Sequence, residues 1–320
     1  MNNNIPLISI VIINYNGLKY LKRTIPKIVN LSYKNKEIII VDNGSKDGSI
    51  EYINSLNNVN LIQSSKIREK NYASNLGINN AKGEYILLCD NDLLIVEDNL
   101  LENLLNQYNY DNKTGILGLS FVNEFEKKTI GYGNYLGLFY TKEKKSLKLD
   151  DLAKLNGIEI SFPSGIGFFI KKEIWNKLGG YDDFLKFGGD DSDIGIKSYM
   201  FGFKNFLYTK SIQIHIGMSE RQDNNKFRIK FRDMFFADLY TMTKNYTKYN
   251  LIITIVLYSI FYFIRSIKQS LFRFHIGPFF AFFEAYYLYI KNINYNLNKR
   301  IDIQGKRIIK EDIFIFKSIH

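Results

Sequence analysis

Short apolar runs alternate with polar loops over the first ninety residues. The four runs are rich in Ile, Leu and Val and occupy residues 7–13, 37–41, 59–63 and 85–89. Continuous runs of this length are typical of strands buried on both faces of a parallel sheet. Segments with helical spacing lie between them, at residues 18–29, 49–56 and 72–81. This alternation predicts βαβ units and an α/β fold with a mostly parallel central sheet.

A second block, residues 158–217, continues the pattern around several glycines. We predict a strand over 161–170, which contains Gly165, and a short helix over 172–178. The acidic loop 188–193 is expected to open a helix, because Asp and Ser favour helix starts. A final strand, which carries His215, follows over residues 206–216.

Polar side chains follow three of the predicted strands. They belong to the loops at residues 14–17, 42–47 and 90–92. In open α/β sheets, ligands bind outside the carboxyl ends of the strands. These loops are therefore expected to converge on one binding site, although each alone is a weak indication.

Asp90 and Asp92 lie two residues apart after a buried strand. Two carboxylates so placed repel each other unless they are paired or bind a metal. Mg²⁺ or Mn²⁺ prefers oxygen ligands and often shares them with phosphate, whose charge the metal offsets when a nucleotide departs. Taken alone, the pair is more simply a solvated turn, because the pattern is common.

Three further residues are candidates for chemistry. Asp42 ends a strand and can reach a nucleobase or ribose, although an Asx turn is the plainer interpretation. Asp191 is the candidate general base, because crowded acids raise one another's pKa; a helix-start charge is an equal alternative. His215 is a candidate metal ligand or a structural histidine.

Composition sets the expected compartment. The chain has 320 residues, is 46% hydrophobic and contains one cysteine, Cys89, which cannot form an internal disulfide. Residues 1–6 lack the features of a signal peptide. We therefore expect a reducing, cytoplasmic location.

Five ordered blocks resemble glycosyltransferase family 2, which has the GT-A nucleotide-sugar-binding fold. They are SIVIINYNG (9–17), EIIIVDNGSKDGS (37–49), NLGI (75–78) with AKGEYILLCDND (81–92), GGYD (179–182) and DDSDI (190–194). His215 lies where many members have a final histidine. Five blocks in order are far more specific than any one of them. The resemblance covers roughly residues 5–217, the predicted catalytic domain at 1–217.

The resemblance implies roles for these residues. Asn14 and Tyr15 would line the nucleotide pocket, and Asp42 would contact the base. Asp90 would contact ribose or diphosphate, Asp92 the metal, and Asp191 would act as base in an inverting transfer. We also predict donor-side residues at Asn75 and Asn91, and acceptor-side residues at Gly165, Asp190 and Asp193.

The chain departs from the family pattern in three places. Asp190 stands where a glutamate is usual, and residues 66–71 replace a segment that usually contains glycine. No Q-x-x-R-W motif is present, so a non-processive transferase that adds one sugar is expected instead of a processive polysaccharide synthase. The resemblance implies a rhamnosyltransferase-like member that transfers a hexose or deoxyhexose.

Residues 218–320 form a basic, aromatic region. They contain 17 Lys and Arg against 8 Asp and Glu, a net charge of +9 out of +11. Residues 226–246 have a basic amphipathic pattern, 249–264 carry no charge, and 278–290 are apolar except for Glu284. As a helix, the uncharged run is roughly 24 Å long, short of the ~30 Å bilayer core.

We predict that these helices lie on an anionic, cytoplasmic membrane surface, since Tyr and Phe favour the interface. Spanning the membrane is the second choice, and packing against protein is the plain structural alternative. Nucleic acid is a poor partner, because the aromatics lie in apolar runs. Membrane attachment would suit a lipid-linked acceptor.

Three functions compete. The first is transfer of a sugar from a nucleotide-sugar donor to a glycan or lipid-linked acceptor. The second is transfer onto polyprenyl phosphate, which is already anionic and needs no strong base. The third is a non-catalytic nucleotide-sugar-binding or scaffold protein, which the complete set of Asp90, Asp92 and Asp191 argues against.

Overall fold

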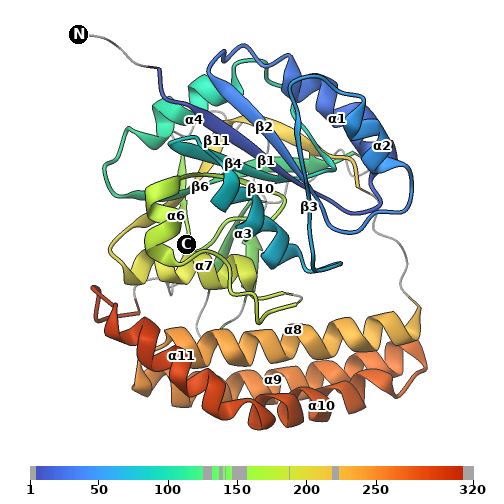
Figure 1. Cartoon of the computed structure of the whole chain (residues 1–320). Helices are drawn as coiled ribbons and strands as arrows, with labels where there is room; N and C mark the ends of the chain where they lie inside the picture. The colour runs from blue at the N-terminus through green and yellow to red at the C-terminus, as the bar shows by residue number, and fades with distance from the viewer. Residues whose placement is uncertain are drawn as a thin grey trace.

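A mixed sheet forms the centre of the protein. The computed structural model describes residues 5–124, 132–136, 140, 142–145, 157–186, 188–217 and 223–312. Within these ranges, nine strands form one sheet in the order β3-β2-β1-β4-β10-β6-β11-β5, with β9 paired to β11. The predicted α/β fold with a mostly parallel central sheet is confirmed (Figure 1).

The predicted strands of the first half are present. They are β1 (Ile8–Asn14), β2 (Lys36–Asp42), β3 (Asn60–Gln63) and β4 (Tyr85–Asp90). All seven residues of β1 are buried, because β1 pairs in parallel with β2 on one side and with β4 on the other. Helices α1 (Leu18–Val29), α2 (Ser49–Asn54) and α3 (Lys70–Asn80) connect them.

The second half adds strands of both directions and further helices. The strands are β5 (Leu93–Leu94), β6 (Thr114–Asn123), β9 (Ile158–Ile160), β10 (Gly167–Lys171) and β11 (Lys204–His215). A separate two-stranded sheet contains β7 (Tyr132–Leu136) and β8 (Lys142–Lys145). The helices are α4 (Leu100–Tyr108), α6 (Lys172–Leu178) and α7 (Asp190–Met200).

The single strand predicted over 161–170 is wrong. Strand β9 ends at Ile160 and β10 begins at Gly167, and a loop that contains Gly165 separates them. β10 runs antiparallel to both β4 and β6, and the Asp90 amide donates to the Ile166 carbonyl at 2.9 Å. The loop between the two strands is thereby held beside the end of β4.

Four helices form a layer below the sheet region. They are α8 (Asn224–Asn245), α9 (Lys248–Arg273), α10 (Gly277–Lys291) and α11 (Ile293–Gly305). Helix α8 contacts α7 on one side and α9, α10 and α11 on the others (Figure 1). One buried hydrophobic cluster includes Ile10 of the sheet as well as Phe235 of α8 and Tyr262 of α9. The predicted boundary at 217/218 adjoins residues 218–222, which lie outside the described ranges.

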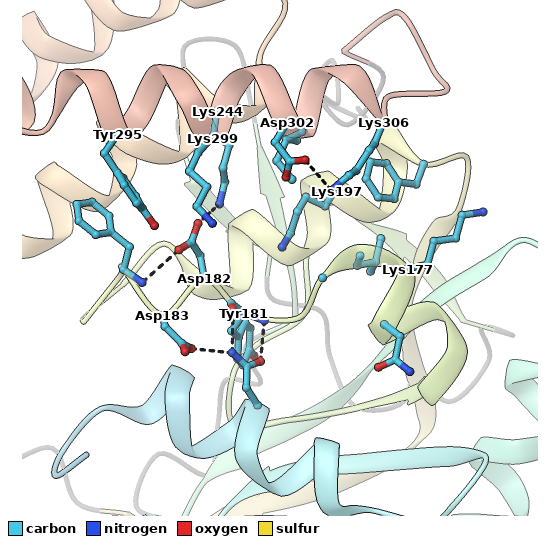
Figure 2. Close-up of a pocket in the computed structure, with 17 residues that line it drawn as sticks. Lys177, Tyr181, Asp182, Asp183, Lys197, Lys244, Tyr295, Lys299, Asp302 and Lys306 are labelled. Carbon is cyan, nitrogen blue, oxygen red and sulfur yellow. Dashed lines mark hydrogen bonds and ion pairs between the residues drawn. The ribbon is translucent and has the colours of Figure 1, made fainter. Parts of the chain in front are cut away.

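A buried lysine joins this layer to the α/β region. Lys244 of α8 is 1% exposed, and its Nζ lies 2.8 Å from Asp182 Oδ2 (Figure 2). The same Nζ lies 3.0 Å from Asp193 Oδ2. Asn245 also donates to Asp193, at 2.7 Å. Burial lowers and the two aspartates raise the pKa of Lys244, with a net upward shift, so the lysine is held charged.

Removing this lysine is expected to destabilise the whole chain. Lys244→Met leaves two buried carboxylates without their shared cation, and breaking a buried pair costs about 3–5 kcal/mol. Urea unfolding followed by circular dichroism measures the loss. Lys248→Met, at an exposed position four residues later, is the matched control and should change stability by less than about 0.5 kcal/mol. Equal midpoints for the two variants would contradict the role given to Lys244.

Candidate active site

The strand register brings three polar loops together at one edge of the sheet. Asn14 is level with Asp42 across the β1–β2 pair, and Ile13 is level with Asp90 across the β1–β4 pair. The Asn14 amide donates to Asp42 Oδ2 at 2.9 Å and accepts from Asn91 Nδ2 at 2.6 Å. The amide of Asn14 therefore ties the ends of all three parallel strands.

Asp42 makes a turn as well as facing this edge. Its Oδ1 accepts from the backbone amides of Gly44 and Ser45, at 3.1 and 2.9 Å. The Asx turn is therefore present, and it fixes the carboxylate of Asp42 at this edge. Contact with a nucleotide stays a prediction. Tyr15 lies at the exposed rim, where the guanidinium of Arg68 is 5.1 Å from its ring centre.

Asp90 is paired with a lysine. Lys70, the first residue of α3, has its Nζ 2.7 Å from the Asp90 carboxylate and 3.0 Å from the Gly165 carbonyl. Burial raises the pKa of Asp90, and Lys70 opposes that effect. Lys70 belongs to the segment that departs from the family pattern, and it puts one positive charge between Asp90 and the loop of Gly165.

Asp92 and His215 face each other across the β5–β11 pair. His215 Nε2 lies 3.1 Å from Asp92 Oδ2, while Asp92 Oδ1 is buried and has no hydrogen-bond partner within the described structure. An orphaned carboxylate oxygen beside an imidazole suits a divalent cation. No cluster of three or more His, Cys, Asp or Glu side chains that could hold a metal is found in the described ranges. Asp92 and His215 thus fit a metal that takes its remaining ligands from phosphate and water.

The candidate base lies at the first turn of α7. Asp191 Oδ2 accepts from the Gly165 amide at 2.8 Å, and Oδ1 accepts from the Tyr181 hydroxyl at 3.3 Å. Burial, followed by the charge of Asp190, raises the pKa of Asp191 to about 7, against the lowering effects of Lys70 and the Gly165 amide. A carboxylate with this pKa is suited to accept a proton near neutral pH.

Gly165 allows the candidate base, Asp191, to lie close to the loop between β9 and β10. A Cβ at this position would lie 2.6 Å from Asp191 Oδ1, closer than real atoms come. Gly165 donates to Asp191 through its amide and accepts from Lys70 through its carbonyl. It therefore links the candidate base Asp191 to the Lys70–Asp90 pair, and its acceptor-side role stays a prediction.

Two of the predicted site residues have structural partners instead. Asp193 is 1% exposed and is neutralised by Lys197 and Lys244, so its predicted place on the acceptor side is wrong. Asn75 uses its amide to bind the backbone of Tyr181, at 3.0 and 2.9 Å, and the carboxylate of Asp183. It holds the turn that carries Tyr181, next to the candidate base Asp191, and its donor-side role stays a prediction.

Behind this turn lies an open cavity of about 420 Å³, lined in part by residues of α6, α7, α8 and α11 (Figure 2). Tyr181 and Asp182 line it, whereas Asp90, Asp92 and Asp191 do not. The cavity therefore lies apart from the acidic edge of the sheet.

Lys70 and Tyr181 could not be found from sequence spacing. Lys70 is 20 residues from Asp90 and 121 from Asp191, and only the fold brings these charges together. Tyr181 lies in a recognised block, GGYD, which pointed to a turn and gave no indication that the hydroxyl would reach the base.

The family model described as glycosyl transferase family 2 matches residues 9–179, more than half of the chain. The chain belongs to glycosyltransferase family 2. The match covers every strand whose end contributes Asn14, Asp42, Asp90 or Asp92, while Asp191 and His215 follow it in the sequence.

Sequence relatives of this family 2 protein are bacterial. A glycosyltransferase of Streptococcus pneumoniae, GlyG, is 37% identical over 34% of this chain and 42% of its own length. An uncharacterised glycosyltransferase of Rickettsia prowazekii, RP339, is 28% identical over 76% of each chain. A cholesterol galactosyltransferase of Borreliella burgdorferi is 31% identical over 40% of this chain and 38% of its own. The match thus spans about two-fifths of the pneumococcal relative.

Solved structures share the fold at low identity. A mannosyltransferase from Pyrobaculum calidifontis, in complex with GDP-Man and Mn²⁺, has a TM-score of 0.54 at 16% identity and covers 95% of this chain and 85% of its own. GalNAc-T7 with UDP, GalNAc and Mn²⁺ has a TM-score of 0.55 at 18% identity, covering 76% and 51%. These likenesses establish a GT-A-like fold for the family 2 protein.

Loss of Asp92 is expected to abolish metal-dependent nucleotide binding. Asp92→Ala removes the carboxylate with the orphaned oxygen, and even outer-shell changes cost 10–100-fold in metal affinity, so a loss of at least about 100-fold is expected. Titration calorimetry of a nucleoside diphosphate with and without Mn²⁺ measures it. Asp98→Ala, an exposed acid six residues along, is the control. Unchanged Mn²⁺-dependent binding in Asp92→Ala would remove the metal assignment.

Proposed function

We propose that this protein is an inverting, non-processive glycosyltransferase that moves one hexose or deoxyhexose from a nucleotide-sugar donor to a hydroxyl of a glycan or lipid-linked acceptor. It would work at the cytoplasmic face of a membrane. The observation that carries the proposal is Asp191, a buried carboxylate whose pKa is raised to about 7 and whose two oxygens are fixed by Gly165 and Tyr181.

Asp191 is proposed to act on the acceptor. The acceptor oxygen would attack the anomeric carbon while its proton passes to Asp191. The bond from that carbon to the diphosphate oxygen would break, and the nucleoside diphosphate would leave with the bonding electrons. Attack from the face opposite the leaving group inverts the anomeric centre.

The donor is proposed to lie along the edge formed by Asn14, Asp42 and Asp90. Asn14 and Asp42 present fixed polar groups to the nucleoside, and Lys70 carries a positive charge next to Asp90 on the path of the diphosphate. Asp92 and His215 would hold Mg²⁺ or Mn²⁺, which supplies charge stabilisation to the leaving diphosphate when bound. Mn²⁺ together with UDP or GDP-Man in the two solved neighbours supports this choice of ligands.

A hydroxyl acceptor is favoured over polyprenyl phosphate. A phosphate acceptor is already anionic and needs no base, whereas Asp191 lies in surroundings that tune it for proton transfer. A non-catalytic scaffold protein would have no use for a carboxylate with a pKa raised in this way.

A screen by thermal shift is expected to identify the donor class. UDP-, GDP- and dTDP-sugars are each added with Mg²⁺ or Mn²⁺, and a ligand at 100 times its Kd stabilises the folded state by about 2.7 kcal/mol. One nucleotide should raise Tm, and only with a metal present. A flat response to every donor with either metal would contradict nucleotide-sugar binding.

Asp191→Asn is expected to lower kcat by about 10²–10⁴-fold with little change in donor affinity, because the base is lost. In the unmodified enzyme, Asp191 is protonated below pH 7, so kcat/KM should fall as pH drops through about 7. This limb should be absent from the residual activity of Asp191→Asn.

Asp183→Asn is the matched control, since Asp183 is exposed and its amide replacement can still accept from Asn75. It should keep both the rate and the pH profile. Near-normal turnover in Asp191→Asn would instead favour a phosphate acceptor and would overturn the proposed role of the base.

A further inference from the structure

The outer face of the helical layer is apolar over most of its length. On α9, large exposed side chains recur at helical spacing, and they are Ile252, Ile253, Val256, Leu257, Ile260, Phe261, Ile264, Ile267 and Leu271. On α10, the exposed set is Phe280, Phe283, Tyr287 and Ile290. Contiguous apolar faces of this size mark an interaction site on a soluble domain. We call this set the α9–α10 face.

The turn between the two helices adds a second apolar feature. Phe272 is 82% exposed and Phe274 is 98% exposed, and Leu271 and Ile276 next to them are also largely exposed. Phe274 has a φ of +50°, which ends α9 and turns its ring away from the helix body. Arg273 lies over the ring of Phe227 and donates to Asn224, so the turn lies beside the start of α8.

The charges around the α9–α10 face have one sign. Helix α9 contains four basic residues and no acidic one, and the only acid of α10, Glu284, is paired with Arg228. Lys248, Lys268 and Lys291 are exposed at the two ends of the face. An uncharged centre between cationic ends is the pattern expected for contact with anionic lipid headgroups.

The packing of α9 argues against a span. Among the described helices, α9 alone is long and apolar enough to cross a membrane. Its inner face, however, is fixed to α8, where Tyr258 donates to Asp238 and Tyr262 donates to the Phe231 carbonyl. Helix α8 in turn holds the α/β region through Lys244. If α9 crossed the membrane, either its hydrogen bonds to α8 would break or the charged residues of α8 would enter the lipid.

We propose that the α9–α10 face lies flat in the surface of an anionic bilayer, with the Phe272–Phe274 turn inserted beside it. A second copy of the chain is a poorer occupant, because a symmetric contact would bring the same exposed lysines together. This proposal rests on the membrane location given in the proposed function and specifies the surface that makes the contact. Its tests use vesicles without donor or acceptor, so its failure is distinguishable from a failure of sugar transfer.

Sedimentation of the full chain with vesicles is the first test. Vesicles of three parts phosphatidylcholine to one part phosphatidylglycerol should bind the protein, and pure phosphatidylcholine should bind it several-fold less. Phe272→Ser with Phe274→Ser should weaken binding by about 10-fold or more, since two buried aromatic contacts are lost. Tyr110→Ser, at a position 87% exposed on the α/β region, is the control and should bind as before. Binding that ignores the turn variant would overturn the proposal.

Depth measurements decide between lying flat and spanning. Cys89 is buried, so a cysteine placed at Ile253, Ile260 or Ile267 can be spin-labelled almost alone. A flat helix gives the three labels nearly equal, shallow depths by paramagnetic relaxation on these vesicles. A spanning helix would separate neighbouring labels by about 10 Å in depth, at 1.5 Å per residue. That gradient would overturn the proposal, as would labels shielded from lipid in a dimer detected by light scattering.

Discussion

The buried charge of Lys244 is the contact on which the arrangement of the two regions depends. A lysine removed from water is costly unless carboxylates surround it, and here Asp182, beside Tyr181, and Asp193 of α7 do so. Asp182 follows Tyr181, and Asp193 lies one half-turn beyond Asp191 on α7. Lys244 therefore holds both the Tyr181 turn and the start of α7, the two segments around the candidate base. The helical layer is therefore fixed to the segments around the candidate site, and detaching α8 would leave Asp182 and Asp193 without Lys244. Gly189 shows how close the fit is: its φ is +76°, and a Cβ there would lie 3.0 Å from Ala237 of α8.

Two aspartates on the same turn of α7 have opposite electrostatic surroundings. Burial acts on both Asp191 and Asp193 to raise the pKa, yet the pKa of Asp193 is lowered because Lys197 and Lys244 outweigh burial. Asp191 has Asp190 beside it, and the lowering effects of Lys70 and the Gly165 amide do not offset burial and that charge, so its pKa is raised. Separating the pKa values of neighbouring acids is how one site can combine a fixed anion with a proton acceptor. The first turn of α7 places both carboxylates, and the neighbouring lysines lower the pKa of one of them, Asp193.

Much of the α/β region could be predicted because its strands are buried on both faces and read as unbroken apolar runs. The register of those strands then followed from the parallel pairing, and it placed Asn14, Asp42 and Asp90 together as expected. Contacts made by long side chains across the fold could not be predicted. Lys70 reaches Asp90, and Lys244 reaches Asp193, over distances along the chain that carry no pattern. Asp193 was misjudged for this reason, since a polar residue in a recognised block can serve a buried partner as well as a substrate. Helix α11 was not predicted, because its many asparagines interrupt the apolar spacing. Helix α8 was predicted to be a basic amphipathic helix, although its last turns are buried.

The position of α8 between α7 and the α9–α10 face determines how far the candidate base, Asp191, lies from that face. Helix α7 contacts α8, and α8 contacts α9 and α10; at 8–10 Å per packed pair, the two steps amount to at most roughly 16–20 Å between α7 and the outer layer. With the outer layer resting on lipid, a phosphate at headgroup level would remain far below Asp191, and only an acceptor tall enough to rise past α8 could present a hydroxyl to it. On the proposed membrane geometry, the thickness of the helical layer would favour a lipid-linked acceptor that already carries sugars over a bare lipid carrier.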